Sequence, residues 1–257
     1  MTLKNDKVPE RLYRYRALGG ADYDKYLEPI LTKARLYFPS RAQLNDPFEC
    51  IAPEFRRTPE LEKLVRSAVN KELAVGRPRN ERRVIKRNAL KRDFLEGVQQ
   101  ETQDMLDRAG ILSFSAVPDE ILLWSHYTNG HRGICLEFES GLLGFSRPIS
   151  EVHYLNFRPE FDASIEGDER TRRLILSKYE GWRYEQEWRV IYGAEKGISY
   201  GEHPFDPKSL TAIIFGCATT ESDKDKVREW VKKGSCKPEF RQAIRRKGAF
   251  AIDIKSL

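Results

Sequence analysis

The chain has 257 residues, of which 40% are hydrophobic, 11% aromatic and 33% charged, with a formal net charge of +6. This composition argues against a disordered chain, and no apolar run approaches the roughly 20 residues of a membrane span. Residues 1–10 lack the apolar stretch of a signal peptide, and the four cysteines form no CxxC pair. We therefore expect a cytoplasmic protein without a structural metal, folded as a single domain over residues 1–257.

The positive charge is concentrated in one segment. Residues 56–92 hold 13 Lys and Arg but 4 Asp and Glu, so they carry nine excess positive charges and the rest of the chain is net −3. A basic segment of this kind is typical of a contact with a polyanion.

Residues 11–16 (RLYRYR) have the alternation of a strand, with Arg14 and Arg16 on one face and Tyr13 and Tyr15 on the other. An arginine facing inward on a first strand is a candidate phosphate clamp, because its planar fork grips two oxygens. The alternative is an exposed edge strand.

A short helix is predicted over residues 27–33 and a short strand over residues 35–38. The Asn-Asp-Pro sequence at residues 45–47 then predicts a turn. The turn is either a simple connection or the rim of a site. The polar side chains around it are Asn45, Asp46 and Glu49.

Helical periodicity runs over residues 58–75, with Thr58 as the N-cap, and again over residues 80–108, with Asn80 as the N-cap. We read residues 58–110 as a basic helical hairpin inserted into a β-rich body. Its basic face is either solvated or a candidate contact with nucleic acid. The side chains of that face are Arg79, Arg82, Arg83 and Lys86.

After Gly110 the pattern is β-rich. Ser113 and Ser115 share one face of a strand over residues 111–115. A short helical segment ending in His126 and Tyr127 follows, and then an Asn-Gly turn. Further strands are predicted over 133–139, 151–157, 210–215, 240–245 and 250–254, and helices over 170–180 and 222–233. The fold class is therefore α+β, with mostly antiparallel strands.

The central element of the pattern is residues 181–192 (GWRYEQEWRVIY), which read as one strand with Glu185, Glu187 and Arg189 on a single face. This face either meets solvent, with a cross-strand ion pair, or lines a polar cleft, since such a row is costly to bury without partners. A Glu-x-Glu pair on a strand is suited to sugar transfer, where one carboxylate stabilises an oxocarbenium-like centre and another handles the acceptor.

These motifs together resemble a bacterial family known as domain of unknown function 2971. The motifs are RLYRYR, LNDPFE, ILSFS, LLWSHYTNGHRGICLEF and WRYEQEWRVIY, and the resemblance extends from about Leu12 to Phe215. The order of elements also resembles the Arg–Ser–Glu class of the ADP-ribosyltransferase superfamily, which implies a split antiparallel sheet, NAD as substrate and no metal. Toxin or phage-defence roles are known in that superfamily.

The second resemblance implies roles for particular residues. Arg14 or Arg16 would grip NAD and Ser113 or Ser115 would order the site. Glu187 would be the catalytic glutamate, with Glu185 addressing the acceptor. Tyr127, beside His126, would stack on nicotinamide, and Arg189 would also contact the substrate. The ILSFS segment departs from the usual Ser-Thr-Ser triplet of that class.

Three functions follow as expectations. The first is an ADP-ribosyltransferase-like enzyme that uses NAD and acts on a macromolecule or water. The second is a non-catalytic nucleic-acid-binding or adaptor protein that uses the basic helical face. The third is a metal-independent nuclease or other hydrolase with His126 or His131 as the base.

Overall fold

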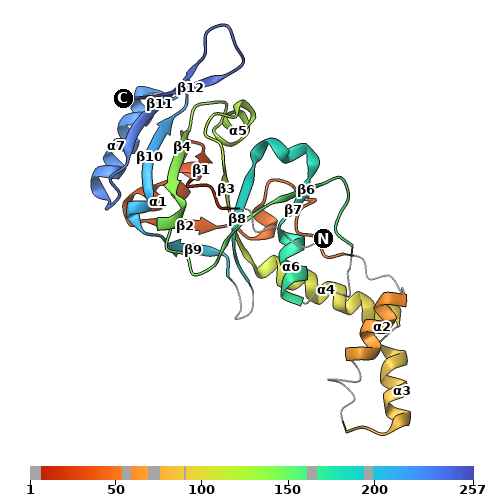
Figure 1. Cartoon of the computed structure of the whole chain (residues 1–257). Helices are drawn as coiled ribbons and strands as arrows, with labels where there is room; N and C mark the ends of the chain where they lie inside the picture. The colour runs from red at the N-terminus through yellow and green to blue at the C-terminus, as the bar shows by residue number, and fades with distance from the viewer. Residues whose placement is uncertain (1–6, 54–58, 69–75, 90, 161–166, 194–198) are drawn as a thin grey trace.

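The computed structural model describes residues 7–53, 59–68, 76–89, 91–160, 167–193 and 199–257. Its central sheet has eight strands, namely β1 (Arg11–Arg16), β3 (Gly110–Ser115), β4 (Ile134–Glu139), β5 (Ile149–Glu151), β8 (Glu187–Tyr192), β10 (Leu210–Phe215), β11 (Glu239–Arg245) and β12 (Ile252–Ser256). Their order is β12-β11-β10-β4-β1-β3-β8-β5 (Figure 1). All neighbours pair antiparallel except β10 and β11, which are parallel. The α+β class with a mostly antiparallel sheet is confirmed.

Two pairs of short strands and seven α-helices complete the described part of the chain. The pairs are β2 (Arg35–Phe38) with β9 (Gly201–Pro204), antiparallel, and β6 (His153–Leu155) with β7 (Ser177–Tyr179), parallel. The helices are α1 (Ala21–Lys33), α2 (Pro59–Ala68), α3 (Arg79–Asn88), α4 (Arg92–Arg108), α5 (Ile121–Tyr127), α6 (Gly167–Ile175) and α7 (Glu221–Lys233). None of them is long and apolar enough to cross a membrane.

The main core covers one face of the sheet. Alternation along the strands directs Leu12, Leu136 and Ile213 to this face, where α1 and α7 cover them with apolar side chains such as Ile30 and Trp230. Figure 1 shows α7 alongside β10 and β11, at the edge opposite α6. Burial of these large side chains, at about 25 cal/mol per Å² of apolar surface, stabilises this layer.

The opposite face carries two smaller apolar clusters with a gap between them. In one, Trp124 of α5 packs against Tyr15 of β1 at a ring distance of 5.2 Å. In the other, Leu106 of α4 and Ile175 of α6 pack over Ile111 of β3. The polar residues of β3 and β8 lie between these clusters, which is why the fold leaves a cavity at that point.

The predicted helical hairpin is wrong in one respect, because residues 80–108 form two helices. α3 ends at Asn88, and Lys91 has an extended backbone before α4 begins. The apolar stripe that suggested one helix divides here, since Val84 is 46% exposed while Leu106 is fully buried. The N-cap position of α3 is held by Pro78 and not by Asn80, and Thr58 lies outside the described residues.

The predicted strand over residues 181–192 is half wrong. Residues 180–185 form the 3-10 helix η4 (Glu180–Glu185), Gln186 has a left-handed backbone with φ 43°, and β8 begins at Glu187. The predicted helix over residues 170–180 also ends early, at Ile175, and is followed by β7. The predicted strands over residues 11–16, 35–38 and 210–215 occur with the predicted bounds. Other predicted elements occur with shifted ends, and residues 69–75 of the predicted helix over residues 58–75 lie outside the described residues. α1, for example, begins at Ala21, and α7 begins at Glu221 with Thr220 as its N-cap.

We predict that Gly133→Ala destabilises the fold by about 1–3 kcal/mol or more, because overpacking of a closed site forces the backbone to move. Gly133 precedes β4, and a Cβ atom there lies 2.1 Å from the carbonyl oxygen of Arg16. Urea unfolding measures the change. Gly141→Ala is the control, since an added Cβ there meets nothing within 4 Å, and equal stability of the two variants would contradict the close approach.

Candidate functional site

A cavity of about 470 Å³ opens between β1, β3, η4 and β8. Its volume lies in the range of small-molecule sites, on the order of 300–1,000 Å³. Its lining includes Tyr13, Arg14, Tyr15, Arg16, Pro39, Gln43, Leu44, Asn45, Glu49, Ser113, Phe114, Ser115, Leu123, Tyr127, Lys178, Glu185, Glu187 and Arg189.

The strand register sets which side chains meet at the cavity. Ser115 pairs with both Tyr13 of β1 and Glu187 of β8, and Ser113 pairs with Arg189. Residues opposite each other in a ladder share a face, so these side chains lie on the face that carries α5. The predicted shared face of Ser113 and Ser115 and that of Glu187 and Arg189 are therefore confirmed, and the register adds that the two pairs lie on the same face of the sheet. The solvent-facing alternative is wrong because Glu187 and Arg189 are buried.

The centre of the site is a buried ammonium among three carboxylates. Lys178 Nζ donates to Glu185 Oε2 at 2.5 Å and to Glu187 Oε2 at 2.9 Å, and lies 3.3 Å from Glu49 Oε1. All four side chains are 4–5% exposed. The three ammonium protons therefore each have a carboxylate to meet, which offsets the cost of removing the charge from water.

Arg189 closes the same network from the other side. Its guanidinium donates to Glu187 Oε1 at 2.7 Å and Oε2 at 2.9 Å, and also to Glu49 and to the carbonyl oxygen of Ile175. Two cations thus face three carboxylates, which leaves one negative charge in excess. Because four of its five N–H donors are engaged inside the protein, Arg189 holds the carboxylates in place.

The protonation of the two glutamates differs for physical reasons. Burial by itself raises the pKa of Glu187, but Arg189 and Lys178 outweigh burial and hold that pKa well below its usual range. For Glu185 burial prevails over the attraction of Lys178, so its pKa is raised from 4.5. The pKa of Lys178 is raised in turn, because the glutamates outweigh the effect of burial.

The glutamates also differ in their remaining capacity to accept hydrogen bonds. Glu187 receives two bonds from Arg189 and one from Lys178, which occupy three of the roughly four lone-pair positions of a carboxylate. Glu185 receives one bond from Lys178 and one from the Tyr127 hydroxyl, at 2.7 Å. Of the two, Glu185 therefore has the greater capacity to bond a ligand.

The backbone around Glu185 is fastened by a serine. The hydroxyl of Ser115 donates to the carbonyl oxygen of Glu185 at 2.7 Å, and the amide of Ala116 donates to that of Gln186 at 3.0 Å. These bonds hold the left-handed Gln186, a conformation that is uncommon for a residue other than glycine. The turn directs Glu185 and Glu187 to one ammonium, which simple alternation along a strand does not predict.

The sheet is open on the arginine side of the cavity. β1 pairs with β4 at six positions but with β3 at one, Tyr13 to Ser115. In the opening the guanidinium of Arg14 donates to the carbonyl oxygen of Ser113 and so takes the place of a missing ladder bond. Arg14 and Arg16 lie on the face of β1 opposite Tyr13 by alternation, and they reach the cavity through this opening.

Both arginines are incompletely paired. Burial lowers the pKa of Arg14, with Arg16 as a second cause, and burial lowers the pKa of Arg16 to about 10. The Nε atoms of both side chains are buried and have no hydrogen-bond partner in the described part of the chain. An anion at this point would supply the missing partner and relieve the repulsion between the arginines.

The structure thus brings together most of the predicted site residues, namely Arg14, Arg16, Ser113, Ser115, Tyr127, Glu185, Glu187 and Arg189. His126 is exposed, faces Trp182 at a ring distance of 6.4 Å, and is not among the lining residues. The basic residues of α3 belong to a helix that projects away from the sheet (Figure 1). Nor does His131, in the turn after α5, line the cavity.

Sequence reasoning missed Lys178 and underestimated Glu49. Lys178 fell inside a predicted helix, whereas it lies on β7, opposite Tyr154 of β6. The available signal was charge balance, because three acidic side chains in one cavity require more than one cation. Among the described residues, no group of three or more His, Cys, Asp or Glu is arranged to hold a metal ion.

We predict that Lys178→Met destabilises the protein by about 3–5 kcal/mol at pH 7, because it leaves three buried carboxylates with one cation. The loss should shrink between pH 7 and pH 5. Without the ammonium the pKa of Glu185 rises further, and a raised carboxyl pKa favours the folded state at low pH. Urea unfolding at both pH values tests this, with the exposed Lys247→Met as control. A pH-independent loss would contradict the carboxylate network.

Comparison with known proteins gives one match. Residues 123–190 match a family described as "Protein of unknown function (DUF2971)". No curated protein and no solved structure matches the chain. The matched segment runs from α5 to β8 and holds Tyr127, Lys178, Glu185 and Glu187, so it supports the resemblance to this family over one side of the cavity.

Proposed function

We propose that the chain is an ADP-ribosyltransferase-like enzyme that binds NAD in the cavity, breaks the bond between nicotinamide and ribose, and passes ADP-ribose to a macromolecule or to water. One observation carries the proposal. Arg14, Ser115 and Glu187 come from the neighbouring strands β1, β3 and β8, with the serine in the middle, and line one cavity. The resemblance to the Arg–Ser–Glu class implies an NAD site built from these three residue types.

The arginine side of the cavity suits the pyrophosphate of NAD. Arg14 is 8% exposed, and its Nε, like that of Arg16, is buried without a partner among the described residues. A guanidinium that is already removed from water loses less hydration free energy when it binds phosphate oxygens than a hydrated guanidinium does. The arginines would therefore hold the phosphates and so orient the nicotinamide ribose toward β8.

The carboxylate side suits the reacting centre. Breaking the bond to nicotinamide develops positive charge on C1 of the ribose, and the network of Glu49, Glu185 and Glu187 carries one negative charge in excess. Its low pKa keeps Glu187 ionised, and its fixed bonds keep it in place, so it contributes as a preorganised charge. Glu185 has free acceptor capacity and would take the proton of the attacking group.

We predict that the purified protein releases nicotinamide from NAD and that Glu185→Gln lowers this rate by about 10²-fold or more, because the amide cannot accept a proton. Glu187→Gln should abolish release, since it removes the ionised carboxylate from the site. Chromatography of nicotinamide measures both, and circular dichroism checks that each variant is folded. The control is Glu139→Gln, at the far end of β4, where the carboxylate pairs with Arg11.

The pH dependence separates a base from a merely structural glutamate. The basic form of Glu185 exists above its pKa, which is raised, so release should fall at a higher pH than an ordinary glutamate would give. This fall in activity toward low pH should be absent from the residual activity of Glu185→Gln. If the folded Glu185→Gln variant keeps full turnover, or if the wild type neither binds NAD nor releases nicotinamide, the proposal is wrong.

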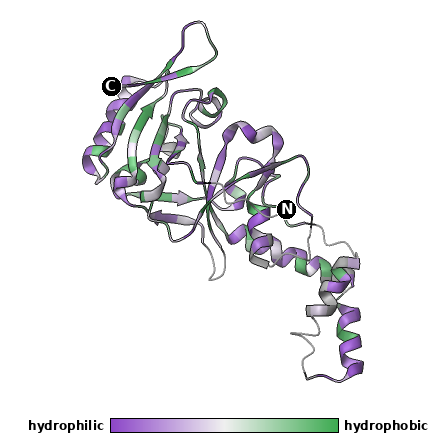
Figure 2. Cartoon of the chain, in the orientation of Figure 1, coloured by the Kyte–Doolittle hydropathy of each residue, from purple (hydrophilic) through white to green (hydrophobic). Residues whose placement is uncertain are grey.

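A second candidate function is binding of nucleic acid by α3, and one observation favours it. None of the residues of α3 is buried, and the helix is strongly hydrophilic along most of its length (Figure 2). A helix without an apolar face gains little from its own packing. Its exposed arginines are Arg79, Arg82 and Arg83, followed by the half-buried Lys86.

We predict that binding of a labelled oligonucleotide weakens steeply as the salt concentration rises. Reversing the charge of Arg82, Arg83 and Lys86 by substitution with Glu should make the slope of log K against log salt shallower by at least about 2, since each lost phosphate contact removes roughly 0.7–0.9. Fluorescence anisotropy over a salt series measures the slope. The control reverses Lys224, Arg228 and Lys232 on α7, at the opposite end of the molecule (Figure 1). An unchanged slope would remove α3 as the contact.

A further inference from the structure

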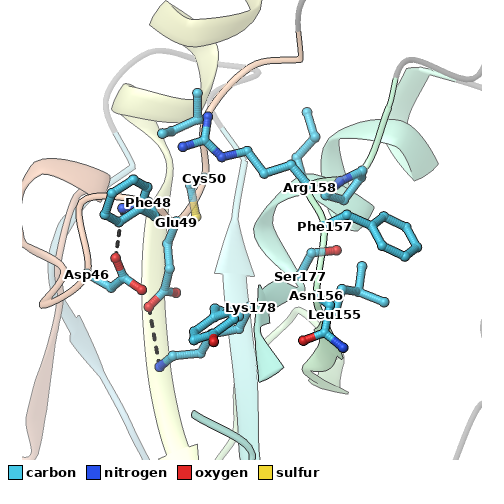
Figure 3. A pocket seen from close by; sticks show the side chains of 14 residues that line it. Asp46, Phe48, Glu49, Cys50, Leu155, Asn156, Phe157, Arg158, Ser177 and Lys178 are labelled. Carbon is cyan, nitrogen blue, oxygen red and sulfur yellow. Dashed lines mark hydrogen bonds and ion pairs between the residues drawn. The ribbon is translucent and has the colours of Figure 1, made fainter. Parts of the chain in front are cut away.

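A second pocket, of about 330 Å³, opens beside the cavity. Its walls are the loop after Pro47, the end of β6 with the residues that follow it, and β7. In Figure 3 Phe48 and Phe157 lie on opposite sides of it, and Lys178 lies at the bottom of the view. Glu49 and Lys178 line both this pocket and the cavity, so a ligand here lies one layer of side chains from the candidate reacting centre.

The pocket is lined by aromatic rings that the fold leaves uncovered. Phe48 is 68% exposed, Phe157 75% and Tyr179 58%. The guanidinium of Arg158 lies over the ring of Phe48, 5.5 Å from its centre (Figure 3). Rings on two walls of one pocket, with a guanidinium beside them, are surfaces of the kind on which proteins stack planar bases.

The polar groups at the pocket have the character of base-edge contacts. The amide of Asn156 is on an exposed residue, and an amide offers both a donor and an acceptor. The Asp46 carboxylate is fixed, since it accepts from the backbone amide of Phe48 at 2.8 Å and from Trp182 Nε1 at 3.0 Å. The pocket thus combines apolar walls with hydrogen-bonding groups, of which the Asp46 carboxylate is held in place.

The basic helix α3 on the same side of the molecule points to a polyanionic ligand. Arg158 lies at its mouth, and Figure 1 shows β6, β7 and α6 on the side of the sheet from which α4, α2 and α3 extend. α3 carries the exposed arginines, so the same side of the molecule offers a stacking pocket and a basic helix. In such sites the aromatic rings stack on a base, and the basic side chains bind the phosphates.

We propose that this pocket is a base-binding subsite for single-stranded nucleic acid. A single strand is required because a base in a duplex is stacked and cannot enter between Phe48 and Phe157. The inference rests on the proposed function in one respect, in that it makes the bound strand the macromolecule to which ADP-ribose is passed.

The transfer then balances with NAD as the donor. The bond between C1 of the ribose and the nicotinamide nitrogen breaks, and nicotinamide leaves with the electron pair. A nitrogen or oxygen of the nucleotide next to the base held in the pocket, which reaches the cavity, forms the new bond to C1. The proton that this atom loses passes to Glu185, which has free acceptor capacity.

Binding of fluorescein-labelled 12-mers tests the subsite by anisotropy at fixed salt. The probes are single-stranded DNA, single-stranded RNA of the same sequence and the DNA duplex. Phe48→Leu and Phe157→Leu keep apolar volume but remove the ring face, and each should weaken single-strand binding about 5- to 150-fold, from 1–3 kcal/mol per stacked base. DNA and RNA strands should both lose affinity, and the duplex should bind more weakly than either.

Phe250→Leu is the matched control, because Phe250 is fully exposed in the turn between β11 and β12 and lies far from the pocket (Figure 1). It should bind as the wild type does. Thermal unfolding confirms the fold of all three variants, which change exposed rings. The subsite is refuted if Phe48→Leu and Phe157→Leu bind single strands as tightly as the wild type, or if the duplex binds as tightly as the single strand, since basic side chains alone then explain binding.

Transfer of radiolabel from NAD distinguishes this inference from the proposed function. Label on the single strand, lost in Phe48→Leu while nicotinamide release without a strand is unchanged, supports both. Nicotinamide release with label on an arginine-rich peptide instead of the strand overturns the subsite and leaves the proposed function standing. Strand binding that depends on Phe48, without any nicotinamide release, supports the subsite and overturns the proposed function.

Discussion

The burial of Lys178 among three carboxylates is the constraint on which the rest of the site depends. An isolated buried ammonium is too costly to keep, so Glu49, Glu185 and Glu187 must all reach it. Glu49 comes from a loop early in the chain, whereas Glu185 and Glu187 come from η4 and β8, which follow β7 directly in the sequence. Because the network is stable only when it is complete, it ties these segments to β7 and fixes the wall of the cavity.

The two sides of the cavity have opposite electrostatic character. Three carboxylates face two cations on the side of β8, whereas Arg14 and Arg16 are desolvated and incompletely paired on the side of β1. The opening between β1 and β3 allows this contrast, since a full ladder there would bring the strands together and close the way from the arginines to the cavity. A ligand with phosphates at one end and developing positive charge at the other fits this distribution.

The sequence predicted the elements whose local pattern and tertiary environment agree. β1 and β3 alternate, β10 is a short apolar run, and the shared face of Ser113 and Ser115 followed from alternation alone. That Glu187 lies on the same face follows from the register of β3 with β8, which the sequence does not show. η4 was missed because its aromatic residues favour a strand, whereas the pairing of Glu185 with Lys178 and the bond from Ser115 hold a tight turn. Lys178 was missed because a single lysine in an amphipathic segment gives no local sign of burial.

The residues common to the cavity and the pocket couple the two spaces. Lys178 and Glu49 line both, and Lys178 sets the field at Glu185. A ligand in the pocket that draws on the Lys178 ammonium weakens its hold on Glu185 and raises the basicity of that carboxylate. By thermodynamic linkage, the factor by which a pocket ligand changes the affinity of the cavity for its ligand is also the factor by which the cavity ligand changes the affinity of the pocket. A base bound in the pocket would thereby adjust the carboxylate that receives the proton of the acceptor in the cavity.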